Sequence, residues 1–89
     1  MNPFYILSLK HSPDKAGSAV WWRADCKGYT TSLAEAGVYD QETIEADPIY
    51  YDNGRTTEAW YKKAVDRLAT AVPFARLVEH ERARHEVKA

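Results

Sequence analysis

The sequence predicts a single α+β domain over residues 1–89: a small antiparallel sheet, made of an N-terminal hairpin and a short third strand, packed against two or three helices. Three observations lead to this expectation. The length allows one small hydrophobic core and leaves no room for a second one. The chain is 45% hydrophobic and 12% aromatic, which is too apolar a composition for a disordered chain. Segments with strand character come first, and a helical pattern begins at residue 57.

The N-terminal hairpin is predicted from two short apolar segments. Residues 4–9 have the aromatic and β-branched character of a strand. Because both faces of that strand would be apolar, we expect it at the centre of the sheet. Turn-forming residues fill 11–17 and a second strand follows over 18–24, so the two should pair antiparallel, with the numbers of paired residues adding up to about 28. Trp21 would lie on the face opposite Trp22, either in a second packing layer or as an exposed contact.

Two short helices are predicted in the middle of the chain. The first covers residues 32–37, and Gly37 would end it. Asp40 would cap a further helical turn over 42–45, because an aspartate before the first helical residue accepts from the free N–H groups there. Pro48 would prevent that turn from continuing.

A short strand, a tight turn and a longer helix are predicted next. Residues 49–51 are a strand candidate, and the Asp-Asn-Gly of 52–54 is the strongest turn signal in the sequence. From Thr57 the pattern becomes helical, with apolar residues recurring every four positions at Trp60, Ala64 and Leu68. The last residues, about 79–89, are almost wholly charged and would form either an exposed helix with ion pairs or a frayed end.

Charge is distributed unevenly along the chain. The formal net charge is −1, yet residues 35–58 hold seven acidic residues against Arg55 alone, and both flanks are mildly positive. Two interpretations are open. The acidic stretch could be an ordinary solvated surface, or it could be a docking face for a basic protein surface, such as one that normally holds nucleic acid.

The common catalytic and metal-binding patterns are absent or poorly placed. The hairpin would put Cys26 about 20 Å from His11, too far for a nucleophile and base pair. His80 and His85 are five positions apart, so they would not face one metal ion on a helix. The four glycines are scattered, which leaves no phosphate-binding loop. We therefore expect a protein that is not an enzyme, with no cofactor and no metal.

Partners and location follow from the same composition. A near-neutral total charge argues against direct nucleic-acid binding, which usually needs a basic excess. No apolar run is long enough to span a membrane, and the first residues lack the layout of a signal peptide. The single cysteine leaves no internal disulfide, which fits a reducing cytoplasm.

The motif in the first two thirds of the chain resembles a family of small phage and prophage proteins. The resemblance covers about residues 3–60 and rests on a tryptophan-containing strand followed by Gly28-Tyr29-Thr30, Leu33, Ala36-Gly37, Tyr39 and Tyr50-Tyr51-Asp52-Asn53-Gly54. It implies expression in a bacterial host, where many such proteins disarm host defences, anti-CRISPR proteins among them. Independently of the family, Gly28 and Gly37 suit turns with positive φ. Tyr29, Leu33 and Tyr39 would hold the short helix on the sheet.

The hypothesis that combines these observations is a non-catalytic phage inhibitor in the cytoplasm of the host. It would bind a host protein, a subunit of a CRISPR effector, and block nucleic-acid binding there. The expected contact residues are six carboxylates and three tyrosines: Glu35, Tyr39, Asp40, Glu42, Glu45, Asp47, Tyr50, Tyr51 and Asp52. Two alternatives remain open at this point. One is a structural or regulatory phage module that forms a homodimer through the hairpin face around Trp21, and the other is a small enzyme that uses Cys26 or a pair of carboxylates.

Overall fold

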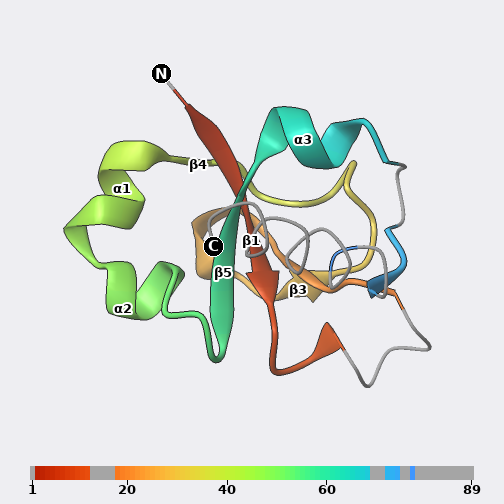
Figure 1. The fold of residues 1–89 in the computed structure, drawn as a ribbon, viewed down its shortest axis with the longest axis horizontal. Helices are drawn as coiled ribbons and strands as arrows, with labels where there is room; N and C mark the ends of the chain where they lie inside the picture. Colours follow the sequence, from red (N-terminus) through yellow and green to blue (C-terminus); the bar gives the residue numbers. More distant parts are fainter. Residues whose placement is uncertain (1, 13–17, 69–71, 75–76, 78–89) are drawn as a thin grey trace, which may run out of the picture.

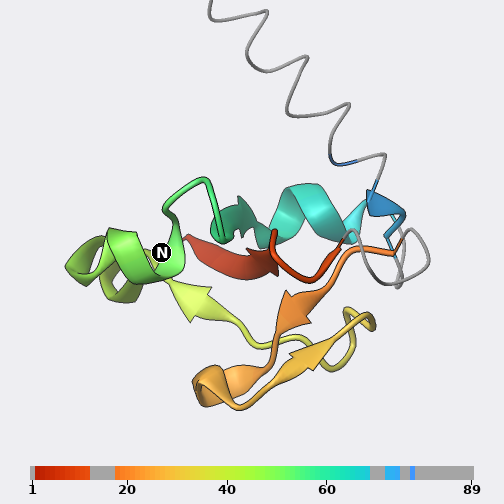
Figure 2. The same ribbon diagram turned by 90° about the horizontal axis from the view of Figure 1, so that it is seen from below.

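β1 (Pro3–Ser8) is the central strand of an antiparallel sheet, and the α+β fold class is as predicted. The computed structural model describes residues 2–12, 18–68, 72–74 and 77 (Figure 1). One edge of β1 pairs along five residues with β5 (Thr57–Tyr61). The other edge is shared between β4 (Tyr39–Asp40), near the start of β1, and β2 (Trp21–Trp22), near its end. β3 (Tyr29–Thr30) extends the sheet beyond β2. The β2–β3 pair lies on one side of the β1–β5 pair (Figure 2).

Hydrophobic residues cover both faces of β1, which confirms its predicted central place. On one face Tyr5 and Leu7 belong to a large buried cluster with Ala19, Trp21, Leu33, Trp60, Val65, Val72 and Leu77. On the opposite face Ile6 belongs to a smaller cluster with Trp22, Tyr39 and Ile44. The alternation of Tyr5, Ile6 and Leu7 between the two clusters is the two-residue period of a strand. One strand therefore holds two separate cores together.

The hairpin has the predicted register, and it decides where Trp21 lies. Leu7 is opposite Trp21, and the N–H of Ser8 donates to the carbonyl of Val20 at 2.8 Å. The Trp21 side chain is fully buried in the larger cluster, 5.6 Å from the Tyr5 ring between ring centroids. Trp21 thus belongs to a second packing layer and is not an exposed contact. A homodimer interface around Trp21 would have no exposed tryptophan to use.

The described residues also form three short α-helices and a single-turn 3-10 helix, η2 (Ala24–Cys26). α1 (Gln41–Ala46) and α2 (Pro48–Tyr51) lie together at one end of the molecule, away from α3 (Lys62–Asp66) (Figure 1). Asp40 caps α1 as predicted, and Pro48 follows the end of that helix. The predicted strand over 49–51 is wrong, because these residues form α2. Pro48 starts this helix at its first position, where the missing N–H of proline costs nothing.

The predicted helix from Thr57 is wrong over its first five residues. They form β5, and helical structure begins only at Lys62. The four-residue spacing of apolar residues is real, but Trp60 packs in the core from a strand and Val65 packs there from α3. The local composition of β5 also favours a strand, since threonine, tryptophan and tyrosine fit a pleated, half-buried surface. The free edge of β1 supplies the partner that turns this preference into a strand.

The predicted helix over 32–37 is also wrong, and a pair of tight turns takes its place. The N–H groups of Glu35 and Ala36 each donate to the carbonyl three residues earlier. Gly37 then leaves the turn, because its N–H donates to the carbonyl of Trp22 at 2.8 Å. Gly37 does not have a positive φ; its need for glycine comes from close backbone packing. Gly28 has the predicted positive φ, at 106°.

The charged tail predicted over 79–89, with His80 and His85, lies outside the described residues. Within the described residues, none of the helices combines the length and the apolar character needed to cross a membrane.

Candidate functional site

Most of the predicted contact residues lie together on the lobe formed by α1 and α2. We call residues 40–52 the acidic lobe; it carries the predicted residues Asp40, Glu42, Glu45, Asp47, Tyr50, Tyr51 and Asp52. Two predicted residues lie elsewhere. Glu35 is exposed near β3, where its carboxylate pairs with the guanidinium of Arg23 at 2.8 Å and accepts from Thr30. Tyr39 is buried and offers no surface to a partner.

Two carboxylates of the acidic lobe accept hydrogen bonds from backbone N–H groups. Oδ1 of Asp40 accepts from the N–H of Thr43 at 2.8 Å and caps α1, and these bonds lower the pKa of the Asp40 carboxyl. Oδ1 of Asp52 accepts from the N–H of Ala59 at 3.0 Å. That N–H faces away from β1 on the edge strand β5. The bond to Asp52 satisfies this backbone donor, which could otherwise pair with a strand of another chain. Both carboxylates therefore stabilise the fold.

The remaining carboxylates of the acidic lobe face solvent. Glu45 accepts from the side-chain amide of Gln41, whereas the side chains of Glu42 and Asp47 have no hydrogen bond within the described residues. No carboxylate of the lobe forms an ion pair in the described part of the chain, and residues 40–54 contain no lysine or arginine. Uncompensated negative charge thus accumulates on one end of the molecule, where it would attract a basic surface.

The acidic lobe also carries an exposed apolar residue, which the sequence pattern does not reveal. Ile49, on α2, is 81% exposed, and its neighbour Tyr50 is 49% exposed. The expected strand over 49–51 hid this arrangement, because a strand would have placed Ile49 against the sheet. The position of Pro48 after the capped helix was the available signal for a second helix. An apolar centre with a charged rim is the usual anatomy of a protein-binding surface.

Four aromatic rings join the acidic lobe to the sheet. Trp22 on β2 lies between 5.2 and 6.3 Å from the rings of Tyr39, Tyr50 and Tyr51, between centroids. The Tyr39 hydroxyl donates to the carbonyl of Arg23 and accepts from the N–H of Cys26 at 3.0 Å. Burial raises the pKa of Tyr39 to about 12. Tyr39 is thus a buried connection between β4 and the loop after β2, and it exposes only 7% of its surface for the predicted role as a contact residue.

The loop after β2 presents the only cysteine. Asp25 and Cys26 both have a φ of 58°, in the left-handed region that non-glycine residues rarely adopt. Sγ of Cys26 is exposed and lies 3.9 Å from the Tyr51 hydroxyl and 4.0 Å from that of Tyr39. The His11 ring packs on the ring of Tyr29, 4.6 Å away, and makes no hydrogen bond to Cys26 within the described residues. The pairing that a cysteine nucleophile needs is not formed there.

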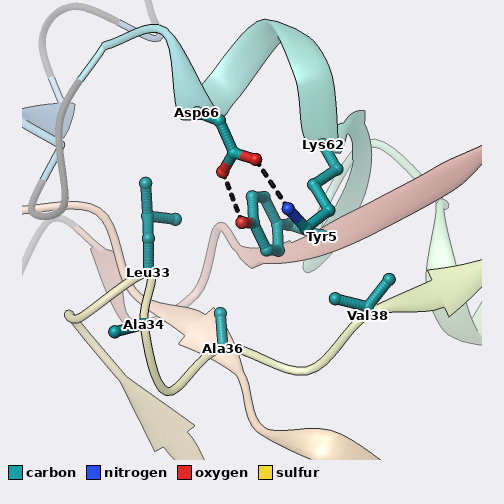
Figure 3. A pocket seen from close by; sticks show the side chains of 7 residues that line it. All are labelled: Tyr5, Leu33, Ala34, Ala36, Val38, Lys62 and Asp66. Atoms are coloured by element: carbon teal, nitrogen blue, oxygen red, sulfur yellow. Dashed lines mark hydrogen bonds and ion pairs between the residues drawn. The ribbon is translucent and has the colours of Figure 1, made fainter.

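A concave surface lies on the opposite side of the sheet from the acidic lobe, because its residues Tyr5 and Leu33 belong to the larger cluster whereas Ile44 of the lobe belongs to the smaller one. Its apolar floor comes from the turn region, with Leu33, Ala34, Ala36 and Val38, and it encloses about 510 Å³ (Figure 3). At one end the carboxylate of Asp66 accepts from the Tyr5 hydroxyl and from Nζ of Lys62, the latter at 2.7 Å. The charges of Lys62 and Asp66 in this groove neutralise each other. The groove therefore lacks the net negative charge of the acidic lobe.

Comparisons with known proteins add no relative. No protein-family model, no curated protein and no solved structure matches the chain. Among the described residues, no group of three or more His, Cys, Asp or Glu side chains is arranged to hold a metal ion.

Proposed function

We propose that this chain is a non-catalytic inhibitor that binds a basic surface of a host protein through its acidic lobe. The observation that supports this most is the exposed Ile49, which lies among carboxylates that have no cation to neutralise them. The partner surface would supply lysine and arginine side chains that normally contact nucleic acid. In the phage setting that the sequence resemblance implies, the partner is a subunit of a CRISPR effector, and the bound inhibitor keeps nucleic acid away.

In this proposal, charged residues and apolar residues of the acidic lobe contribute to binding in different ways. Exposed charges such as Glu42 and Asp47 attract an oppositely charged surface over a distance and orient it. Burial of a large apolar side chain at the centre of the contact then supplies affinity, because few residues carry most of the binding energy of an interface. In this proposal Ile49 and Tyr50, which are both exposed on α2, supply that apolar contact.

The test measures target-DNA binding by purified CRISPR effector complexes, each with and without the purified protein. We expect one complex to lose DNA binding, and we expect 0.5 M NaCl to relieve the inhibition, because salt screens exposed charges. The variant Glu42→Gln/Asp47→Asn should weaken inhibition about tenfold, since both carboxylates are exposed and free of partners in the described structure. Ile49→Ser should weaken it more, by about thirtyfold.

Each variant has a matched control on another part of the surface. Thr31→Lys/Ala64→Lys changes the net charge by the same amount as the first variant, at two exposed positions outside the acidic lobe. Val38→Ser removes an exposed aliphatic side chain from the groove of Figure 3. Full inhibition by the Glu42→Gln/Asp47→Asn variant would contradict the assigned surface. A dimer that depends on concentration, with no complex inhibited, would identify a self-associating phage module instead.

A further inference from the structure

A small pocket next to the acidic lobe is lined mostly by aromatic rings. It lies between α2 and the loop that joins β2 to β3, and it encloses about 180 Å³. Its lining residues are Trp22, Cys26, Gly28, Tyr29 and Tyr50. The volume is well below the roughly 300–1,000 Å³ of sites for drug-sized ligands, so it suits a single side chain.

Three different segments hold the aromatic walls in place. Trp22 is largely buried and anchors the pocket from β2, and its ring centroid lies 5.2 Å from that of Tyr50. Tyr50 reaches the pocket from α2, whereas Tyr29 reaches it from β3, where the His11 ring supports it at 4.6 Å. Tyr29 and Tyr50 each leave about half of their surface exposed. Their rings are therefore fixed but accessible.

The charges around the pocket favour a cation. None of its lining residues is basic. The nearby guanidinium of Arg23 is already paired with Glu35, and its Nε donates to the carbonyl of Tyr29 at 3.2 Å. The pKa of the Tyr50 hydroxyl is raised, chiefly by the neighbouring Cys26 and further by Tyr29 and Asp47. Asp47 lies one helical turn before Tyr50, whose N–H donates to the Asp47 carbonyl at 3.1 Å, so this exposed acidic residue adds negative charge next to the pocket.

We propose that this pocket receives one arginine side chain of the partner, held by the faces of the aromatic rings. A guanidinium stacks on aromatic faces, and its planar, weakly hydrated charge is attracted to the electrons of the ring. Gly28 has no side chain to fill the space, and its φ of 106° favours glycine there. This inference rests on the proposed function, because it names the group of the basic partner that the surface would recognise.

The test uses a blocked tripeptide, Gly-Arg-Gly, and its neutral counterpart with citrulline in place of arginine. Citrulline has nearly the same shape but no charge. We expect the arginine peptide to shift the indole N–H signal of Trp22 in nuclear magnetic resonance spectra, with much smaller effects on Trp21 and Trp60. Tyr29→Leu should weaken binding about fivefold, the equivalent of about 1 kcal/mol. Equal binding of the citrulline peptide would overturn the proposal.

Two further variants make the result specific. Tyr61→Leu removes a tyrosine of similar exposure, 57%, from outside the pocket and should leave peptide binding unchanged. Lys27→Gln removes the exposed cation next to Gly28 in sequence and should tighten binding, because it relieves like-charge repulsion. If Tyr29→Leu and Tyr61→Leu have the same effect on the peptide, the pocket is not the binding site. Thermal unfolding of each variant shows whether it is folded.

The two proposals can fail separately. The tripeptide carries one charge and is too short to cover the acidic lobe, so it reports on the pocket. Inhibition of an effector that depends on Glu42 and Asp47, together with no peptide binding, would overturn the arginine pocket and leave the proposed function in place. Binding of the arginine peptide with no inhibited effector would overturn the proposed function and leave the arginine pocket in place.

Discussion

Gly37 passes so close to Ala24 that a Cβ on Gly37 would lie 2.5 Å from the backbone nitrogen of Ala24. The neighbouring atoms belong to the backbone, so they cannot move aside as a flexible side chain would. The contact fixes the turn region of residues 32–37 against the start of the loop that presents Cys26. A residue predicted to end a helix instead allows two segments to touch.

Gly37→Ala should therefore destabilise the protein by roughly 2–3 kcal/mol, because it forces extra volume into a packed site. Gly54→Ala is the control. Gly54 has a φ of 76° but nothing within 4 Å of its Cβ position, so only backbone strain of about 1 kcal/mol is expected. Urea unfolding of both variants measures the difference. A cost for Gly37→Ala no larger than that for Gly54→Ala would refute the close-packing explanation.

Asp40 should make the stability of α1 depend on pH in acid. Hydrogen bonding to the N–H of Thr43 lowers the pKa of the Asp40 carboxyl below its usual 3.8. A carboxyl with a lowered pKa stabilises the fold above its unfolded pKa, and this stabilisation is lost as the pH falls through the folded pKa. Asp40→Asn should keep most of the cap but remove this pH dependence, since asparagine is also a good N-cap.

The measurement for Asp40 is amide hydrogen exchange at Thr43 between pH 5 and pH 2. Asp40→Ala should speed this exchange at the higher pH, because the cap is lost. Glu42→Ala is the matched control, as its carboxylate has no hydrogen bond in the described structure. Equal acceleration in the two alanine variants would show that the general charge of the lobe, and not the cap, controls α1.

Tyr39 should make the fold less stable in alkali. Burial raises the pKa of Tyr39 to about 12 in the folded chain, against 10.0 for an unperturbed tyrosine. The unfolded chain therefore loses this proton first, and stability is full below pH 10 and falls as the pH rises towards 12. Tyr39→Phe should flatten that part of the stability curve while lowering stability at neutral pH, because the bonds to Arg23 and Cys26 are lost.

Urea unfolding at several pH values between 8 and 12 compares the wild-type chain with Tyr39→Phe. Other tyrosines with raised pKa act in the same direction, so the relevant quantity is the difference between the two curves. Tyr61→Phe serves as a control at an exposed ring. Parallel curves for wild type and Tyr39→Phe would contradict the role of this buried hydroxyl.

Tyr5 and Lys62 should both act on Asp66 at the end of the groove. Desolvation raises the pKa of the Asp66 carboxyl, but hydrogen bonds from Lys62 and Tyr5 lower it by more, so the net shift is downward. In a double-mutant cycle, Tyr5→Phe and Asp66→Ala should couple by about 1 kcal/mol, a value reduced for solvent screening because the carboxylate is partly exposed. Tyr5→Phe paired with Glu42→Gln provides a non-interacting control. Simple additivity in the first cycle would show that the bond does not stabilise the fold.

The parts of the fold that the sequence predicts are those that local chemistry determines. The apolar faces of β1 predict its central place, and the turn-forming residues before Ser18 predict the hairpin and its register. The Asp40 cap follows from the preference of helix N-termini for short polar acceptors. Each of these features depends on residues close to one another in the chain.

The wrong predictions depend on contacts between distant residues. Residues 57–61 carry apolar groups at spacings that fit a helix or a strand, and pairing with β1 decides for the strand. Residues 32–37 have helical composition, but the bond from Gly37 to Trp22 ends the turn early. Tyr29 was expected to pack inward, yet β3 is an edge strand and leaves it 51% exposed. Predicting these three features requires knowing where a distant segment of the chain lies.

The candidate site divides in the same way. The acidic residues of the lobe were found from charge alone, because five carboxylates without a basic residue stand out in any conformation. Ile49 was missed, since its exposure depends on α2 being a helix. The distinction between Asp52, which bonds to Ala59, and Asp47, which has no bond in the described structure, also needed the structure.

The split pairing of β1 has a consequence for synthesis on the ribosome. β1 is made first, yet its longest partner, β5, lies between 49 and 57 positions later along the chain. Until β5 has left the exit tunnel, one edge of β1 has no partner and the apolar residues on its two faces lack part of their cover. The nascent chain must therefore hold its first strand in an unfinished state while most of the remaining residues are added, and closing so long a loop is slow compared with forming local turns. A premature stop before Thr57 would release a product in which the edge of β1 that normally pairs with β5 is open, a form prone to aggregation and proteolysis.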